Sequence, residues 1–148
     1  MELDLNEEQR ILSKSAKDFL KKECPKSLVR TLREEEREFP PDLWRKIAEM
    51  GWLGVEIPEE YGGTGGGFLD LCLILEAMGE ACLPGPFFAA AVLGVTALLK
   101  AGSEAQKMAF LPGIADGRTL MTLALNEPGN WYGFSNLKTR AEKQGEVY

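Results

Sequence analysis

The sequence FLDLCLILEAMGEA, residues 68–81, is apolar on nearly all sides, and PFFAAAVLGVTALLK, residues 86–100, repeats this composition. A helix that is apolar all round must be surrounded by other elements. The seven large apolar side chains of the second segment would each contribute roughly 1.5–3 kcal/mol on burial, on the order of 10–20 kcal/mol together. The two segments therefore predict a pair of buried central helices in a mainly α fold.

Start and stop signals predict four further helices around this pair. Asn6 and Ser103 are each followed three positions later by glutamine, which is the spacing of a capping box. Pro25 stops the helix before it, and Pro41 fits the first turn of another. The predicted helices cover residues 6–23, 27–36, 41–50 and 103–111, and the last is expected to end before Pro112.

The pattern changes after Gly117. Residues 119–125 alternate weakly and predict a strand, Asn126–Gly129 has the composition of a turn, and residues 137–142 suggest a second strand. One or two strands do not make a stable sheet. The sequence therefore predicts a helical domain over residues 1–117, followed by an incomplete β-domain segment over residues 118–148. It points to a longer natural protein, a cut chain, or a partner that supplies the remaining strands.

Composition excludes several classes of function. The chain has 148 residues and a net charge of −6, so a nucleic-acid backbone would repel it. It contains no histidine, which removes catalytic triads that need histidine and every histidine-ligated metal site. The longest uncharged stretch, residues 81–99, is interrupted by Pro84, Gly85 and Pro86. About 13 apolar-rich residues remain, too few for a membrane span.

The cysteines predict a reducing compartment. Cys24, Cys72 and Cys82 show no C-x-x-C spacing, so reduced thiols are favoured over a disulfide framework or a zinc site. The N-terminus is charged and polar, unlike a signal or transit peptide. Together these features predict a cytoplasmic protein.

Two short tracts each allow two interpretations. The glycines of residues 62–67 lack the Gly-Lys-Ser/Thr of a phosphate-binding loop, so a flexible turn between helices is favoured. Ala89–Ala91 allow either tight helix packing or a pocket wall. The charge run over residues 33–38 is interpreted as a solvated face.

Taken together, these features resemble the acyl-CoA dehydrogenase family, in its N-terminal helical domain and the first part of its middle β-domain. The resemblance spans essentially the whole chain but less than half of the usual family length. The stretches that carry it are GWLGVEIPEEYGGTG (51–65), AGSEAQK (101–107), LPGIADG (111–117), LALNEP (123–128) and LKTRA (137–141).

The resemblance implies a flavoenzyme that holds FAD and removes hydrogen from the α and β carbons of an acyl-CoA thioester. A glutamate takes the α-proton and flavin N5 takes the β-hydride, which requires base and flavin on opposite faces of the Cα–Cβ bond. The product is a trans-2-enoyl-CoA, and electrons leave through an electron-transferring flavoprotein. Such enzymes are oligomers, and their base lies in or near the C-terminal domain, so no catalytic residue is assigned here.

The resemblance also assigns binding residues. FAD contacts are expected from Leu123, Leu125, Asn126 and Tyr132, and substrate contacts from Tyr132, Phe87 and Ala89. The tract Asn130–Gly133 departs from the small Ala-Gly-Ser-Asp residues of the family, since Trp131 and Tyr132 are bulky. Either the loop has moved, or this subunit binds FAD or acyl-CoA poorly or differently.

Two functions therefore compete. The chain is part of an FAD-dependent acyl-CoA dehydrogenase and inactive alone, or it is a non-catalytic subunit or interaction module of a heteromeric complex. A generic helical adaptor without a link to CoA is a third and remote interpretation.

Overall fold

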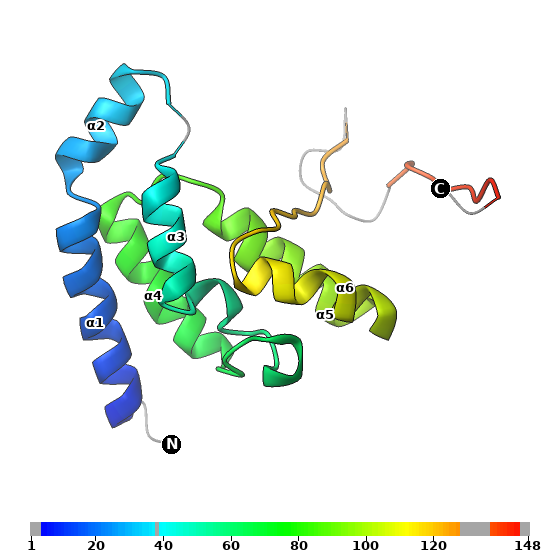
Figure 1. The fold of residues 1–148 in the computed structure, drawn as a ribbon, viewed down its shortest axis with the longest axis horizontal. Helices are drawn as coiled ribbons and strands as arrows, with labels where there is room; N and C mark the ends of the chain where they lie inside the picture. Colours follow the sequence, from blue (N-terminus) through cyan, green and yellow to red (C-terminus); the bar gives the residue numbers. More distant parts are fainter. Residues whose placement is uncertain (1–3, 38, 128–136, 146–148) are drawn as a thin grey trace.

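The computed structural model describes residues 4–37, 39–127 and 137–145. These residues form six α-helices, two three-residue 3-10 turns and one seven-residue π-helix (Figure 1). The described part of the chain contains no β-sheet. The mainly α fold predicted from the sequence is confirmed.

Helix α1 (Glu7–Glu23) begins and ends where its sequence signals predict. The Asn6 side chain accepts a hydrogen bond from the Gln9 backbone N–H at 2.8 Å, and the Gln9 side chain accepts one from the Asn6 N–H at 3.2 Å. This reciprocal capping box satisfies two backbone donors that the first turn leaves open. The helix ends at Glu23, with Cys24 as its C-cap.

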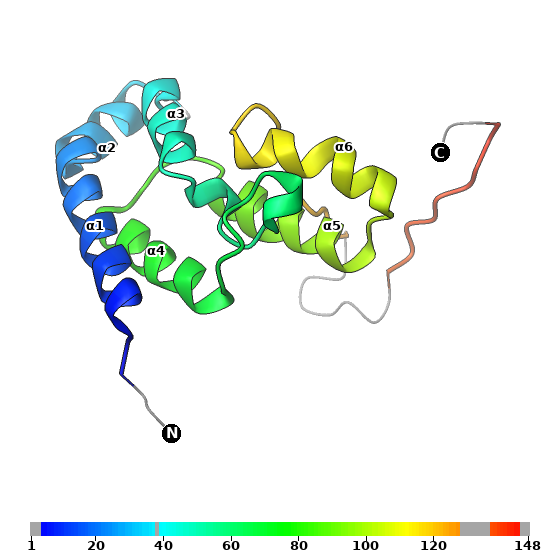
Figure 2. The same cartoon turned by 60° about the horizontal axis from the view of Figure 1, so that its bottom comes forward.

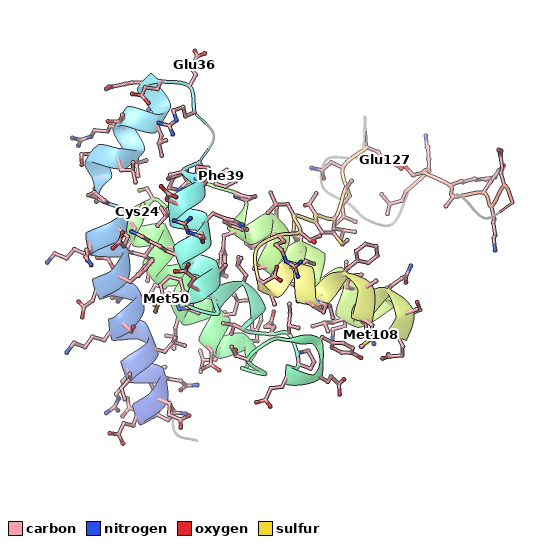
Figure 3. The ribbon with its side chains drawn as sticks, in the orientation of Figure 1. Cys24, Glu36, Phe39, Met50, Met108 and Glu127 are labelled. Atoms are coloured by element: carbon pink, nitrogen blue, oxygen red, sulfur yellow. The ribbon has the colours of Figure 1, made fainter. Side chains whose placement is uncertain are left out.

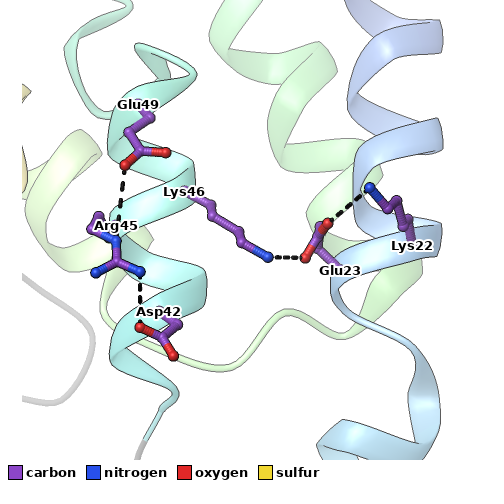
Figure 4. A network of polar contacts seen from close by, with 6 residues as sticks. All are labelled: Lys22, Glu23, Asp42, Arg45, Lys46 and Glu49. Atoms are coloured by element: carbon purple, nitrogen blue, oxygen red, sulfur yellow. Dashed lines mark hydrogen bonds and ion pairs between the residues drawn. The ribbon is translucent and has the colours of Figure 1, made fainter.

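Helices α2 (Lys26–Glu34) and α3 (Pro41–Glu49) follow as predicted to within a few residues. Pro41 lies in the first turn of α3, where the missing N–H costs nothing. Lys46 of α3 forms an ion pair with Glu23 of α1, and Lys22 lies 3.4 Å from the same carboxylate (Figure 4). The Lys46–Glu23 ion pair ties the end of α1 to α3.

Helix α4 (Phe68–Ala81) packs along α1 (Figures 1 and 2). Its inner face joins α1, α3 and the turn η1 (Trp52–Gly54) in the first core cluster, whose buried members include Leu20, Trp52 and Ile74. The prediction that α4 is surrounded is wrong for its first turn, where Phe68 is 66% exposed and Leu69 is 50% exposed. An apolar composition alone does not show which end of a helix lies at the surface.

The second central segment is not one regular α-helix. Residues Phe88–Gly94 form the π-helix η3, which runs directly into α5 (Val95–Ala101). A π-helix takes up more residues per turn than an α-helix, so the 3.6-residue pattern could not reveal it. Phe88 at its start is 55% exposed, although the sequence predicts burial.

Helix α6 (Glu104–Ala115) begins at the predicted Ser103 capping box but runs through Pro112. The prediction that it ends before Pro112 is wrong. Proline has a φ compatible with a helix and removes one hydrogen bond. Leu111, Ile114 and Ala115 around it are buried in the second core cluster, which offsets that loss.

The two predicted strands do not form. Residues 119–126 have no regular secondary structure. Glu127 and Gln144 are isolated β-bridge residues and do not extend into strands. A strand needs neighbouring strands to satisfy its backbone, and the described residues provide no such ladder. The tip of the predicted turn, Pro128–Gly129, lies outside the described residues.

Candidate functional site

The segment that leaves α6 is held by contacts over residues 119–121. Residues 122–126, called the open segment below, follow these contacts. The Thr119 N–H donates to the Gly113 carbonyl at 2.8 Å, and the Met121 side chain packs against the second core cluster. Leu123 is 39% exposed, Leu125 is half-buried and Asn126 is exposed. No backbone hydrogen bond joins residues 120–126 to another described residue.

This open segment tests whether the chain fits a flavin. The polar edge of a flavin ring needs hydrogen-bond donors and acceptors, which the backbone of this segment and the Asn126 amide supply. Leu123 and Leu125 supply apolar surface beside them. These residues offer the kinds of group that one side of a flavin requires, and none of them is chemically incompatible with it.

Glu127 has a structural task at the end of this segment (Figure 3). Its carboxylate accepts hydrogen bonds from the Lys138 N–H at 2.9 Å, from the Thr139 N–H at 2.6 Å and from the Thr139 hydroxyl. The Thr139 hydroxyl and these two amides hold the pKa of Glu127 below its ordinary value. Glu127 thus ties residues 119–127 to residues 137–140, a role that its Glu-Pro motif alone could not show.

The predicted substrate residues are placed differently from one another. Phe87 is buried in the first core cluster and also lines a groove of about 260 Å³ with Met78, Leu83 and Phe88. Ala89 is half-buried and does not line that groove. Tyr132, predicted for both cofactor and substrate, lies outside the described residues, as does the whole Asn130–Gly133 tract.

Ala90 and Ala91, in the tract with two interpretations, are buried in the first core cluster. This burial favours tight packing for these two residues.

Another groove of the described residues, about 410 Å³, contains none of the predicted site residues. It lies between α1 and α4, with Lys17, Lys21 and Glu80 among its lining residues. Cys24 at its floor is 2% exposed, and burial raises the pKa of its thiol. A protonated thiol is a poor nucleophile, so this groove offers no evident chemistry.

The glycine-rich tract connects two helical elements, as predicted, and hydrogen bonds hold part of its backbone. The Gly63 N–H donates to the Pro58 carbonyl at 3.2 Å, and the Thr64 N–H to the Gly54 carbonyl at 3.0 Å. A Cβ on Gly63 would lie 1.9 Å from the Ile57 carbonyl oxygen. The tract serves close backbone packing.

Tyr61, in the turn η2 (Glu59–Tyr61), connects this tract to α6. Its hydroxyl donates to the Glu104 carboxylate at 2.6 Å, while Lys107 lies 2.9 Å from the other oxygen. The hydrogen bond to Glu104 and burial raise the pKa of Tyr61 to about 12. The stretch that contains Tyr61 is therefore joined to the start of α6. The open segment follows the other end of that helix.

Two kinds of site are absent from the part of the chain that the structure describes. No group of three or more histidine, cysteine or carboxylate side chains there could hold a metal ion. Likewise, none of the helices described is both long and apolar enough to cross a membrane.

Residues 6–118 match the family model described as "Acyl-CoA dehydrogenase, N-terminal domain". The chain belongs to the acyl-CoA dehydrogenase family. It is 35% identical over its whole length to the probable acyl-CoA dehydrogenase YngJ of Bacillus subtilis, of which it covers 39%. It is 31% identical over 97% of its length to the mitochondrial isovaleryl-CoA dehydrogenase of Pongo abelii, of which it covers 34%.

Solved structures of this family have the same fold. An acyl-CoA dehydrogenase from Geobacillus kaustophilus superposes with a TM-score of 0.81 at 27% identity over 98% of the chain, which covers 38% of that protein. A Bacillus anthracis acyl-CoA dehydrogenase complexed with FAD superposes with a TM-score of 0.72 at 33% identity over 85% of the chain, and 22% of that protein is covered. The chain thus spans less than two fifths of the length of these relatives.

Proposed function

We propose that this chain is the N-terminal part of an FAD-dependent acyl-CoA dehydrogenase, which converts an acyl-CoA thioester to a trans-2-enoyl-CoA. The observation that carries the proposal is that residues 6–118 match the N-terminal domain of this family and lead into the open segment 122–126, which makes no backbone hydrogen bond to another described residue. Residues 1–117 form the helical domain, and residues 118–148 begin the β-domain that the family places next.

FAD, when bound, supplies the hydride acceptor for the β-carbon of the substrate. Leu123, Leu125 and Asn126 would lie along the flavin, and Tyr132 would contact cofactor or substrate. Phe87 and Ala89 would shape the end of the acyl pocket. In the family the base that removes the α-proton lies in or near the C-terminal domain, whereas residues 6–118 match the N-terminal domain, so the 148 residues alone are expected to be inactive.

Purification from the native source and anaerobic addition of acyl-CoA thioesters tests this function. The protein that contains this sequence is expected to hold flavin, whose visible band bleaches as an enoyl-CoA two hydrogens lighter forms. A flavin-bearing protein that no acyl-CoA reduces would contradict the proposed reaction. An absence of flavin would contradict the cofactor as well.

The altered tract Asn130–Gly133 supports a second candidate, a non-catalytic subunit of a heteromeric acyl-CoA dehydrogenase. Heteromers occur among the relatives, since one matching structure is the ChsE4–ChsE5 complex from Mycobacterium tuberculosis, with a TM-score of 0.78 at 28% identity over 87% of this chain and 36% of that chain. Replacing Trp131-Tyr132 by Gly-Ser in the native complex separates the candidates. Flavin content that rises supports the non-catalytic subunit, whereas unchanged or reduced content supports the enzyme.

The proposed partners follow from the proposed reaction. A reduced flavin needs an electron acceptor, and an electron-transferring flavoprotein suits it. A structure entitled "Electron transferring flavoprotein of Acidaminococcus fermentans" is among those that match this chain, with a TM-score of 0.71 at 29% identity over 87% of this chain and 34% of that chain. A homo- or hetero-oligomer fits the family, and a reducing compartment such as the cytoplasm fits the free thiols of Cys24, Cys72 and Cys82.

A further inference from the structure

Two glycines inside helices contact the chain that leaves α6. Gly94 is the last residue of the π-helix η3, and Gly113 lies within α6. Gly94 has φ −64°, which any residue adopts, so its backbone does not require glycine. Glycine is also a poor helix former compared with alanine. Both positions therefore need another physical reason for glycine.

The reason is the closeness of residues 119–121. A Cβ on Gly94 would lie 2.8 Å from the Met121 carbonyl oxygen and 3.1 Å from its carbonyl carbon. A Cβ on Gly113 would lie 2.4 Å from the Thr119 hydroxyl oxygen. The first contact is with backbone atoms, so Gly94 lets the segment lie directly on its helix. The second is with a side-chain hydroxyl, so a methyl group at Gly113 would force the Thr119 side chain to turn, with the Thr119 Cβ only 3.2 Å away.

These contacts fix a short segment from two sides. Figure 2 shows the chain turning back after α6 and passing alongside the η3–α5 helix. The Thr119 N–H donates to the Gly113 carbonyl, and the Met121 side chain packs into the second core cluster. The open segment starts directly after these anchors. Its position and direction therefore depend on them.

We propose that Gly94 and Gly113 are positioning residues that place Leu123–Asn126 against the flavin. The seating of residues 119–121 on the two glycines stands on the geometry alone. The effect on the flavin rests on the proposed function.

Amide hydrogen exchange of the native protein that contains these 148 residues tests the seating. Gly94→Ala and Gly113→Ala are each expected to speed exchange of the Thr119 amide about tenfold or more, while α1 and α4 keep their protection. Gly79→Ala is the matched control, because Gly79 lies inside α4 and an added Cβ meets nothing within 4 Å. Unchanged exchange at Thr119 in both test variants would overturn the proposal.

A second substitution distinguishes the contact at Gly113 from the contact at Gly94. It also distinguishes a local clash from general unfolding, because only a local clash can be rescued. Thr119→Ala removes the hydroxyl that Gly113→Ala would strike and leaves the Thr119 Cβ 3.2 Å away. The double variant is therefore expected to recover slow exchange. Thr119→Ala cannot rescue Gly94→Ala, whose clash is with the Met121 backbone. Failure of the first rescue, or success of the second, would contradict the assigned contacts.

The flavin-bearing native protein tests the effect on the cofactor. Gly94→Ala is expected to shift the visible flavin spectrum and midpoint potential, whereas Gly67→Ala, whose Cβ would make ordinary contact with Asp70, leaves both unchanged. Faster exchange at Thr119 without any change in the flavin would overturn the positioning role. A wild-type protein without flavin would sink the proposed function, and the exchange result would still decide the seating.

Discussion

Tyr61 is the residue through which the Pro-Glu-Glu-Tyr motif acts on the rest of the fold. Its ring is buried in the second core cluster, and its hydroxyl donates to Glu104 in the first turn of α6. The sequence marks the motif as typical of the family. The contact with Glu104 depends on tertiary packing, so the sequence alone did not predict it.

The pKa of Tyr61, raised to about 12, predicts a late step in an alkaline titration. Below the ordinary value of 10 the phenol is protonated in both folded and unfolded chains, and its contribution to stability is complete. That contribution is lost as the pH rises from 10 through about 12, because only the unfolded chain ionises early. Ultraviolet absorbance should show one of the three tyrosines titrating late. Tyr61→Phe should remove that step, and its persistence would contradict the assignment.

Among the glycines of residues 62–67, Gly63 has the least space for a side chain. Gly63→Ala is expected to destabilise the chain by at least about 3 kcal/mol, because the new methyl group would overlap the Ile57 backbone. Urea unfolding measures the difference. Gly67→Ala, four residues along the same tract, is the control and should change stability far less. Equal effects of the two variants would show that the tract is not packed as described.

At the scale of elements, sequence signals succeeded where the interaction is local. The Asn6 and Ser103 capping boxes lie within four residues, so their spacing alone predicted where α1 and α6 begin. The π-helix η3 and the passage of α6 through Pro112 were missed. The first lies outside the 3.6-residue pattern used to predict helices, and the second accompanies burial in the second core cluster, whose members are distant in the sequence.

The cap of α1 gives a prediction about this element. Asn6→Ala is expected to lower the free energy of unfolding by about 1 kcal/mol, because the Gln9 N–H loses its acceptor. Asn6→Asp keeps an acceptor oxygen and should retain most of the stability. Urea unfolding of the three proteins measures both effects. Equal losses in the two variants would contradict the capping role.

The contact between α1 and α3 predicts a dependence on acid. Hydrogen bonding to Lys46 holds the pKa of Glu23 below its ordinary value of 4.5. The contact therefore contributes fully above that pH, and its contribution is lost as the pH falls through the lower, folded-state pKa. Glu23→Gln should flatten the fall of thermal stability below pH 4.5. Glu49→Gln, which leaves the α1–α3 contact intact, should not, and a matching effect would contradict the linkage.

At the scale of the molecule, the sequence predicted the helical class and the family but not the state of residues 119–126. Their weak alternation predicts a strand, yet a strand forms only beside partner strands. Of the candidate residues, Leu123, Leu125 and Asn126 share one open segment, while Phe87 lies in the first core cluster. A pattern of residue types does not show which side chains surround a given residue. The sequence therefore predicted Phe87 as a substrate contact but not the residues that pack around it in the first core cluster.

The central claim is that this helical domain and its open segment serve a flavoenzyme larger than 148 residues. The most direct test is an intact mass of the polypeptide isolated from its native source, measured with the flavin extracted from the same sample. The account predicts a polypeptide heavier than 16.3 kDa and FAD in the extract of the same sample. A complete native chain of 16.3 kDa that carries no flavin, alone or in any complex, would contradict it.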